Sequence, residues 1–220
     1  MFRLLTRQPP IQPATEAFVF VDAPRAITLI DRDLELVEPA QRHIDDLLAA
    51  CHHPLTKKDM PVQARTTRES LQTFLEQSPR GRTFPDAGRG ITAGYTFWMR
   101  IRPLPPDSRL LPLPVTMAGS ISLRIGHCEN LDFFLGHIGY HVLPPARGNH
   151  YAERACRLLL PLARAHGHKV LWITCNPDNF GSRRTCERLG ATLVEVVQVP
   201  RDNALYSQGD RQKCRYKIHL

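Results

Sequence analysis

The sequence contains no apolar run of the length that a membrane span requires, which is about 20 consecutive residues. The N-terminal region also lacks the apolar core of a signal peptide, because Pro9, Pro10 and Pro13 interrupt it. These absences exclude a membrane-spanning or secreted class of protein at the level of the sequence. We therefore expect a cytoplasmic protein without a membrane partner.

The cysteines lack the spacing of a metal site or a disulfide framework. No CxxC pair and no regular interval occurs among Cys51, Cys128, Cys156, Cys175, Cys186 and Cys214. Cys156 and Cys175 lie in apolar periodic segments, where a small buried thiol is the usual state. We expect neither disulfides nor a zinc site.

The charge shows no block of one sign. The chain has 29 Lys and Arg residues against 21 Asp and Glu residues, a formal net charge of +8 that is spread along the sequence. A nucleic-acid-binding sheet would interleave aromatic residues with Lys and Arg, and the predicted strands carry few such combinations. Nucleic-acid binding therefore rests on charge alone. The same charge is equally typical of a solvated basic surface and of a surface that attracts a phosphate-bearing ligand.

The 220 residues suffice for one α/β domain with a full core. We expect an irregular arm over residues 1–25 and a single domain over residues 26–220. Apolar periodicity predicts strands over 27–37, 91–101, 115–125, 136–143, 169–175, 191–199 and 213–220. It predicts helices over 38–50, 67–77, 151–166 and 179–189. Residues 51–64 and 78–90 have the composition of turns and loops, and five prolines in residues 102–114 predict a long hairpin loop.

This order predicts an α/β (α+β) fold, with a mixed central sheet of about six to seven strands flanked by helices. Residues 137–152 are its most informative segment, since an apolar strand is followed there by a tight turn and the start of a helix. Backbone N–H groups in such a turn converge on one point, where the positive end of the helix dipole favours a phosphate group. The same strand, turn and helix also occur in α/β proteins that bind no phosphate.

Two motifs favour a phosphate-binding turn over a turn that binds no phosphate. The turn reads Arg147-Gly-Asn-His-Tyr-Ala152, and a second segment from Asn179 to Gly190 begins Asn-Phe-Gly-Ser and ends in Leu-Gly. In these motifs and their separation, the chain from about Tyr95 onward resembles the GNAT acyltransferase superfamily, in its predicted acetyltransferase branch. The resemblance implies acetyl-CoA as cosubstrate, a cofactor-binding core at about residues 115–199, and splayed strands in the second half of the chain.

The resemblance also implies roles for individual residues. The backbones of Tyr140, His141 and Val142 would pair with the pantetheine arm, although ordinary sheet pairing is the alternative for all three. The backbone N–H groups of the turn would hold the pyrophosphate; its members are Arg147, Gly148, Asn149, His150, Tyr151 and Ala152. Asn179 and Ser182 would lie near the arm, with helix capping as the alternative for Asn179. His150 stands where most members of the superfamily have glycine.

The catalytic groups depart from the family pattern. Cys186 stands where many members have a tyrosine that protonates the leaving thiolate, and Gly136 stands where some have a carboxylate. His137 and His141 share one strand face and are the candidate bases, because a histidine titrates near neutrality; a structural role is the alternative for each.

We therefore expect an N-acetyltransferase in which an amine attacks the thioester directly. The alternative is a catalytically inactive acyl-CoA-binding module. The sequence leaves three properties open: the amine acceptor, which is a small molecule or a protein, the acyl-chain preference, and the oligomeric state, a homodimer included.

Overall fold

The structure is a computed structural model that describes residues 20, 29–86, 91–103 and 112–220. The predicted arm over residues 1–25 lies outside this part of the chain except for Phe20. Most of the proline-rich loop also lies outside it. Among the described residues, no helix combines the length and the apolar character needed to cross a membrane.

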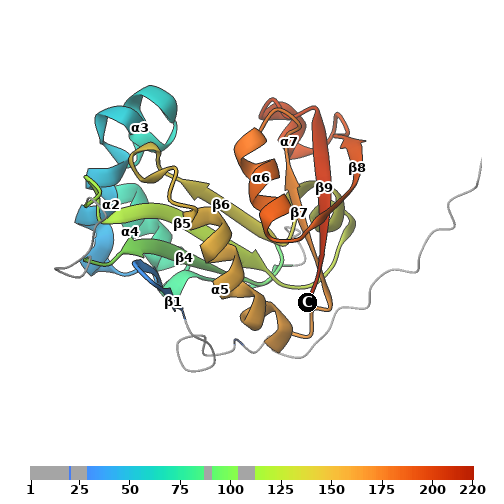
Figure 1. The fold of residues 1–220 in the computed structure, drawn as a ribbon, viewed down its shortest axis with the longest axis horizontal. Coiled ribbons are helices and arrows are strands. Elements are labelled where there is room, and N and C mark those ends of the chain that lie inside the picture. The colour runs from blue at the N-terminus through green and yellow to red at the C-terminus, as the bar shows by residue number, and fades with distance from the viewer. Residues whose placement is uncertain (1–19, 21–28, 87–90, 104–111) are drawn as a thin grey trace, which may run out of the picture.

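The strands form two antiparallel sheets (Figure 1). The larger sheet has the order β1-β2-β4-β5-β6, and β3 pairs with β4. Its strands are β1 (Ile30–Asp31), β2 (Leu34–Val37), β3 (Arg82–Thr83), β4 (Gly94–Ile101), β5 (Met117–Arg124) and β6 (Ile138–Val142). The smaller sheet has the order β7-β9-β8. Its strands are β7 (Val170–Cys175), β8 (Thr192–Gln198) and β9 (Gln212–His219).

Helices flank these sheets (Figure 1). The α-helices are α2 (Ile44–Cys51), α3 (Pro54–Asp59), α4 (Arg68–Gln77), α5 (Tyr151–Ala165), α6 (Phe180–Arg188) and α7 (Ala204–Ser207). Short 3₁₀ turns cover Gln41–His43, Gln63–Arg65, Pro79–Gly81 and Pro144–Ala146, and a π-helical turn covers Leu131–Leu135.

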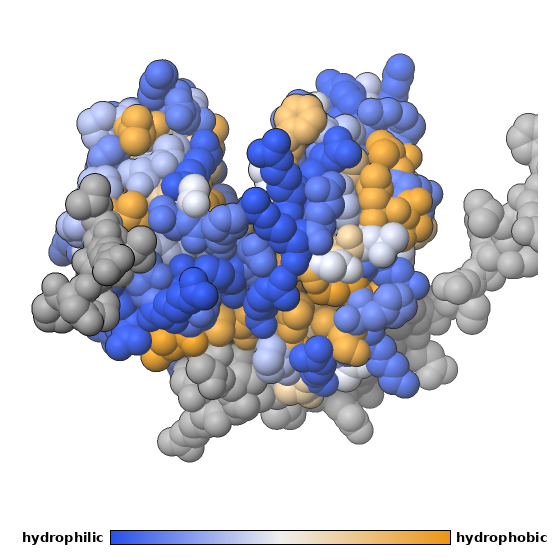
Figure 2. Space-filling model, viewed as in Figure 1, coloured by the Kyte–Doolittle hydropathy of each residue, from blue (hydrophilic) through white to orange (hydrophobic). Residues whose placement is uncertain are grey.

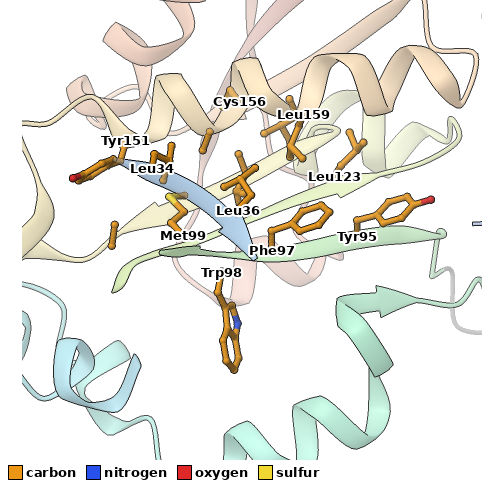
Figure 3. Close-up of a cluster of buried hydrophobic side chains, with 14 of the residues drawn as sticks. Leu34, Leu36, Tyr95, Phe97, Trp98, Met99, Leu123, Tyr151, Cys156 and Leu159 are labelled. Carbon is orange, nitrogen blue, oxygen red and sulfur yellow. The ribbon is translucent and has the colours of Figure 1, made fainter. Parts of the chain in front are cut away.

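Strand β4 shows how both faces of the larger sheet are covered (Figure 3). Phe97 and Met99 point toward α5, whose buried residues recur at helical spacing: Ala155, Cys156, Leu159, Leu162 and Ala163. Trp98 points to the opposite face, where its ring stacks on Phe74 of α4 at a centroid distance of 6.4 Å. Alternate residues of one strand therefore belong to two apolar layers.

The predicted α/β fold and most of its elements are confirmed, with four corrections. The strand expected over residues 27–37 is a hairpin of β1 and β2, because Arg32 adopts a left-handed φ of 54° between them. Residues 51–64, expected as turns, contain α3, which begins with Pro54 and is capped by the His53 side chain. The loop expected over 78–90 contributes β3 to the larger sheet.

The fourth correction concerns the sheet, which is divided in two at β6 and β7. The two strands are joined where the His137 N–H donates to the Trp172 carbonyl over 2.6 Å and the Trp172 N–H donates to His137 Nδ1 over 2.9 Å. Within the described chain they then enter different sheets, which confirms the predicted splay. A cavity of about 200 Å³ opens between them, lined by Tyr140 and Gly139 on one side and Cys175 on the other.

Candidate functional site

A large cavity lies at the open end of this splay. It has a volume of about 670 Å³, and Figure 2 shows the surface hollowed between the part that carries α3 and the part that carries α6 and α7. The end of β6, the turn into α5 and the start of α6 line it, together with Met60 at the end of α3. We call this cavity the acyl cleft. Sequence reasoning missed Met60 because it placed no helix in that region.

The turn that precedes α5 exposes backbone donors to the acyl cleft. Gly148 has a φ of 88° and His150 a φ of 57°, so the chain enters the left-handed region twice within three residues. The side-chain amide of Asn149 holds the turn by donating to the carbonyls of Ala146 and Arg147, over 3.1 and 3.2 Å. No side chain caps the N-terminus of α5. The N–H groups of its first turn have no partner within the helix and are available to an anion.

His150 does not block this turn, although it replaces the family glycine. Its Nδ1 lies 2.7 Å from Nη1 of Arg188, the residue that ends α6. Arginine can only donate, so Nδ1 accepts the bond and Nε2 of the neutral ring carries the hydrogen. The imidazole thereby links the two helix ends and adds one donor to the lining of the acyl cleft.

Asn179 caps α6. Its Oδ1 accepts the backbone N–H of Ser182 over 3.0 Å, which is the alternative that sequence reasoning kept open. Both residues nevertheless line the acyl cleft. The Ser182 hydroxyl is turned toward β6, where it lies 2.8 Å from the hydroxyl of Tyr140.

Tyr140 therefore contributes more than the backbone contact expected of it. Its side chain crosses from β6 to α6 and is half-buried near the thiols of Cys186 and Cys156. Burial raises the pKa of the Tyr140 hydroxyl above its usual value, with a smaller contribution from these two thiols. The hydroxyl stays protonated at neutral pH and can act as a proton donor. The sequence could not reveal this pair, because 42 residues separate its members.

The backbone of β6 has one paired edge and one open edge. The N–H of Arg124 donates to the carbonyl of His137, and the N–H of Leu143 donates to the carbonyl of Ala118. In an antiparallel pair such residues alternate with residues whose backbone groups point away from the partner strand. The backbone of Tyr140 and Val142 therefore faces the splay, where the Val142 carbonyl accepts from Nε of Arg147 over 3.2 Å. The backbone of His141 faces β5 and does not reach the open edge, contrary to the expectation.

The two candidate bases occupy different surroundings. His141 is half-buried and lines the acyl cleft; its Nδ1 lies 3.3 Å from the hydroxyl of Ser120, and burial lowers the pKa of its imidazole. His137 is fully buried and does not line this cavity. Its Nδ1 accepts from Trp172 and its Nε2 lies 3.1 Å from the carbonyl of Gly126, while burial lowers its pKa to about 4. The structure thus brings His141, but not His137, to the candidate site.

Two thiols stand behind Tyr140. Cys186, at the position of the family tyrosine, is fully buried. A hydrogen bond between its thiol and that of Cys175, together with burial, raises the pKa of Cys186. The same hydrogen bond lowers the pKa of the Cys175 thiol, which lies at the end of β7 in the wall of the smaller cavity. Sequence reasoning treated Cys175 as an inert core residue. The only signal for its placement was that it ends a strand next to the splay.

Residues 33–192 match the sequence model of a family described as the acetyltransferase (GNAT) domain. The structure is similar to that of the microcin C7 self-immunity acetyltransferase MccE, solved with acetyl-CoA and AMP: the TM-score is 0.60 at 20% identity over 86% of this chain and 94% of that one. It is similar to RimL, a ribosomal L7/L12 alpha-N-protein acetyltransferase solved with coenzyme A, with a TM-score of 0.59 at 18% identity over 88% and 98% of the two chains.

A GNAT-family acetyltransferase from Bacillus anthracis gives a TM-score of 0.55 at 14% identity over 87% and 97% of the two chains. A search among proteins of curated function gives no match. At these sequence identities the structural similarity establishes the fold alone. The chemistry has to be inferred from the residues of the site.

Proposed function

Because the chain belongs to the GNAT acetyltransferase family, with the family domain matched over residues 33–192, we propose that it transfers an acetyl group from acetyl-CoA to an amine. One observation carries the proposal: the acyl cleft joins the open edge of β6 to the uncapped N-terminus of α5. A thioester arm needs an extended partner and its pyrophosphate needs converging N–H groups, and this cavity offers both. The similar structures of MccE and RimL were solved with acetyl-CoA and coenzyme A, which supports the choice of cosubstrate.

The pyrophosphate is assigned to the turn over residues 147–152. Gly148 and the first turn of α5 supply N–H donors, and Arg147 and Arg188 add positive charge at the rim of the cleft. Glu153 in the same turn would repel an anion, but Arg157 pairs with its carboxylate over 3.0 Å. The turn therefore keeps a net attraction for phosphate.

The thioester is assigned to the space beside Val142. A backbone N–H on the open edge of β6 can donate to the carbonyl oxygen and stabilise the negative charge that develops there. The amine nitrogen attacks the carbonyl carbon, the carbon–sulfur bond breaks, and the thiolate of coenzyme A leaves. His141 accepts the proton of the amine, directly or through a water molecule. His137 is not assigned this role because both of its ring nitrogens already have partners inside the protein.

The leaving thiolate takes its proton from the Tyr140–Ser182 pair. Both residues line the cleft and their hydroxyls lie 2.8 Å apart, so a proton lost by the serine is replaced from the tyrosine. A hydroxyl from the strand thereby replaces the tyrosine that the family carries on the helix. The acceptor class within the amines, whether a small molecule or a protein N-terminus, stays open.

A catalytically inactive acyl-CoA-binding module is the second candidate function. One observation favours it: Cys186 and Gly136 stand where the family has its tyrosine and, in some members, its carboxylate. The test is a transfer assay with acetyl-CoA and a panel of small amines and peptides, in which the released thiol is measured. Thiol release that depends on an amine supports the transferase. Acetyl-CoA binding without release across the panel supports the binding module.

A further inference from the structure

Three histidines meet at the end of β6 that lies away from the acyl cleft. His127 follows β5, His137 precedes β6, and His168 lies between α5 and β7. Their ring centroids are 4.9 to 5.2 Å apart, and one ring nitrogen from each lies within 4.8 Å of the others. Three separate turns of the chain therefore present imidazoles to one point.

A carboxylate stands beside them. Oδ1 of Asp132, in the π-helical turn, lies 3.1 Å from Nδ1 of His127 and 3.5 Å from Nε2 of His137. Two ligand atoms of a tetrahedral zinc ion, each about 2.0–2.1 Å from the metal, are about 3.3 Å from one another. The separation of His127 Nδ1 and Asp132 Oδ1 already corresponds to one edge of such a site.

His168 gives an independent sign of a missing ligand. Its side chain is 6% exposed, and neither ring nitrogen has a hydrogen-bond partner among the described residues. A buried polar group without a partner is costly and rare in folded proteins. A metal ion bound to one of these nitrogens would supply the partner.

The hydrogen bonds of His137 give it a different role from that of His127 and His168. Its Nδ1 accepts from the Trp172 N–H, so Nε2 carries the ring hydrogen and faces Asp132 and the carbonyl of Gly126. It can hold the carboxylate in place but has no free lone pair for a metal. Ligating carboxylates are commonly oriented by such donors.

We propose that this cluster binds one Zn²⁺ ion through His127, His168 and Asp132, with His137 as the group that orients the carboxylate. Two imidazoles and a carboxylate suit zinc, which also accepts a water molecule as its fourth ligand. The proposal departs from the sequence expectation of no zinc site, which was drawn from cysteine spacing and did not consider the histidines.

The position of the site indicates a structural role. It lies at the closed end of the splay, where the larger sheet meets β7 through the His137–Trp172 bonds. Val142 lies five residues after His137 on an extended strand that rises about 3.3 Å per residue. The histidine cluster is therefore about 16 Å from the space beside Val142 that is assigned to the thioester. The ion would fix the two sheets to one another without touching the reacting atoms, so the proposal stands apart from the proposed acetyl transfer.

The test uses untagged protein that has been treated with EDTA and then titrated with Zn²⁺ in a calorimeter. We expect one ion per chain. We also expect a melting temperature higher by about 5–10 °C at a zinc concentration 100-fold above the Kd. Substitution by Co²⁺ should give the visible absorption of a nitrogen and oxygen site without a thiolate charge-transfer band. A thiolate band would place the metal on cysteine and overturn the proposal, as would the absence of binding.

Variants separate the site from other zinc-binding groups. His168→Leu should melt at the same or a higher temperature than the wild type in EDTA, because it removes an unpartnered buried group, and should show no shift with zinc. Exposed His127→Ala and Asp132→Asn should each weaken binding at least tenfold. His219→Ala, on an exposed histidine of β9, is the matched control and should bind like the wild type. Unchanged zinc binding in His168→Leu would overturn the proposal.

Discussion

The hydroxyl of Tyr140 on β6 and the hydroxyl of Ser182 on α6 lie 2.8 Å apart. This bond connects the two walls of the splay at the point where the thioester is assigned. Both residues line the acyl cleft, and the half-buried tyrosine stays protonated because burial raises its pKa. The pair can therefore pass a proton to a leaving group in the cleft.

Tyr140→Phe should lower kcat by about 10²-fold, because general acid catalysis contributes about 10²–10⁴-fold. The ring and its packing remain, so the KM for acetyl-CoA should change by less than about threefold. Steady-state kinetics of thiol release measure both constants. Tyr206→Phe, on α7 outside the cleft, is the control and should leave both constants unchanged. Full activity in Tyr140→Phe would remove the tyrosine from the proton path.

Cys186→Ala should keep most of the turnover, because the thiol is fully buried and lines neither the acyl cleft nor the smaller cavity. The loss of a buried sulfur should lower the free energy of unfolding by about 1 kcal/mol. Kinetics and urea unfolding of the same preparation measure the two effects. A loss of turnover of about a hundredfold, with folding and cofactor affinity intact, would make this cysteine the acid.

The pH–rate profile should show an acidic limb that belongs to His141. Burial lowers the pKa of this imidazole, so its neutral, proton-accepting form persists below the usual value of about 6.5. Activity should therefore hold down to about pH 6.5 and fall only as the pH drops through the lower folded pKa. In His141→Gln the limb should disappear and kcat should be low throughout. An unchanged limb in this variant would assign it to another group.

Gly136→Ala should destabilise the protein by about 2–3 kcal/mol. Gly136 has a φ of 72°, and a Cβ placed there would lie 2.9 Å from the backbone nitrogen of Thr174, where β6 and β7 meet. Gly190→Ala is the matched control, with a φ of 80° and open space around its Cβ, and should cost about 1 kcal/mol. If urea unfolding gave equal losses of stability for the two variants, the close approach of the strands at Gly136 would contribute nothing to the destabilisation.

Local features of the site were predictable from the sequence, and features that join distant segments were not. The turn over 147–152 and helix α5 follow from a glycine, a basic residue and helical periodicity, all within 20 residues. The Tyr140–Ser182 bond, the outward backbone of Val142 and the unpartnered His168 depend on which strands become neighbours. The α3 helix was missed because six residues, begun by Pro54 and capped by His53, contain too few apolar positions for a periodic pattern.

Calorimetric titration with acetyl-CoA of the wild type and of Arg147→Glu tests the central claim, that the cosubstrate binds in the acyl cleft with its pyrophosphate at the start of α5. The substitution puts a negative charge at the rim of that turn, and Arg201→Glu makes the same charge change at an exposed position outside the cleft. We predict one binding site in the wild type. The affinity of Arg147→Glu for acetyl-CoA should be at least about tenfold weaker, a loss of about 1.4 kcal/mol in binding free energy. The affinity of Arg201→Glu should be unchanged. Equal affinity in all three proteins would contradict the assignment of the turn, and no binding to the wild type would contradict the account as a whole.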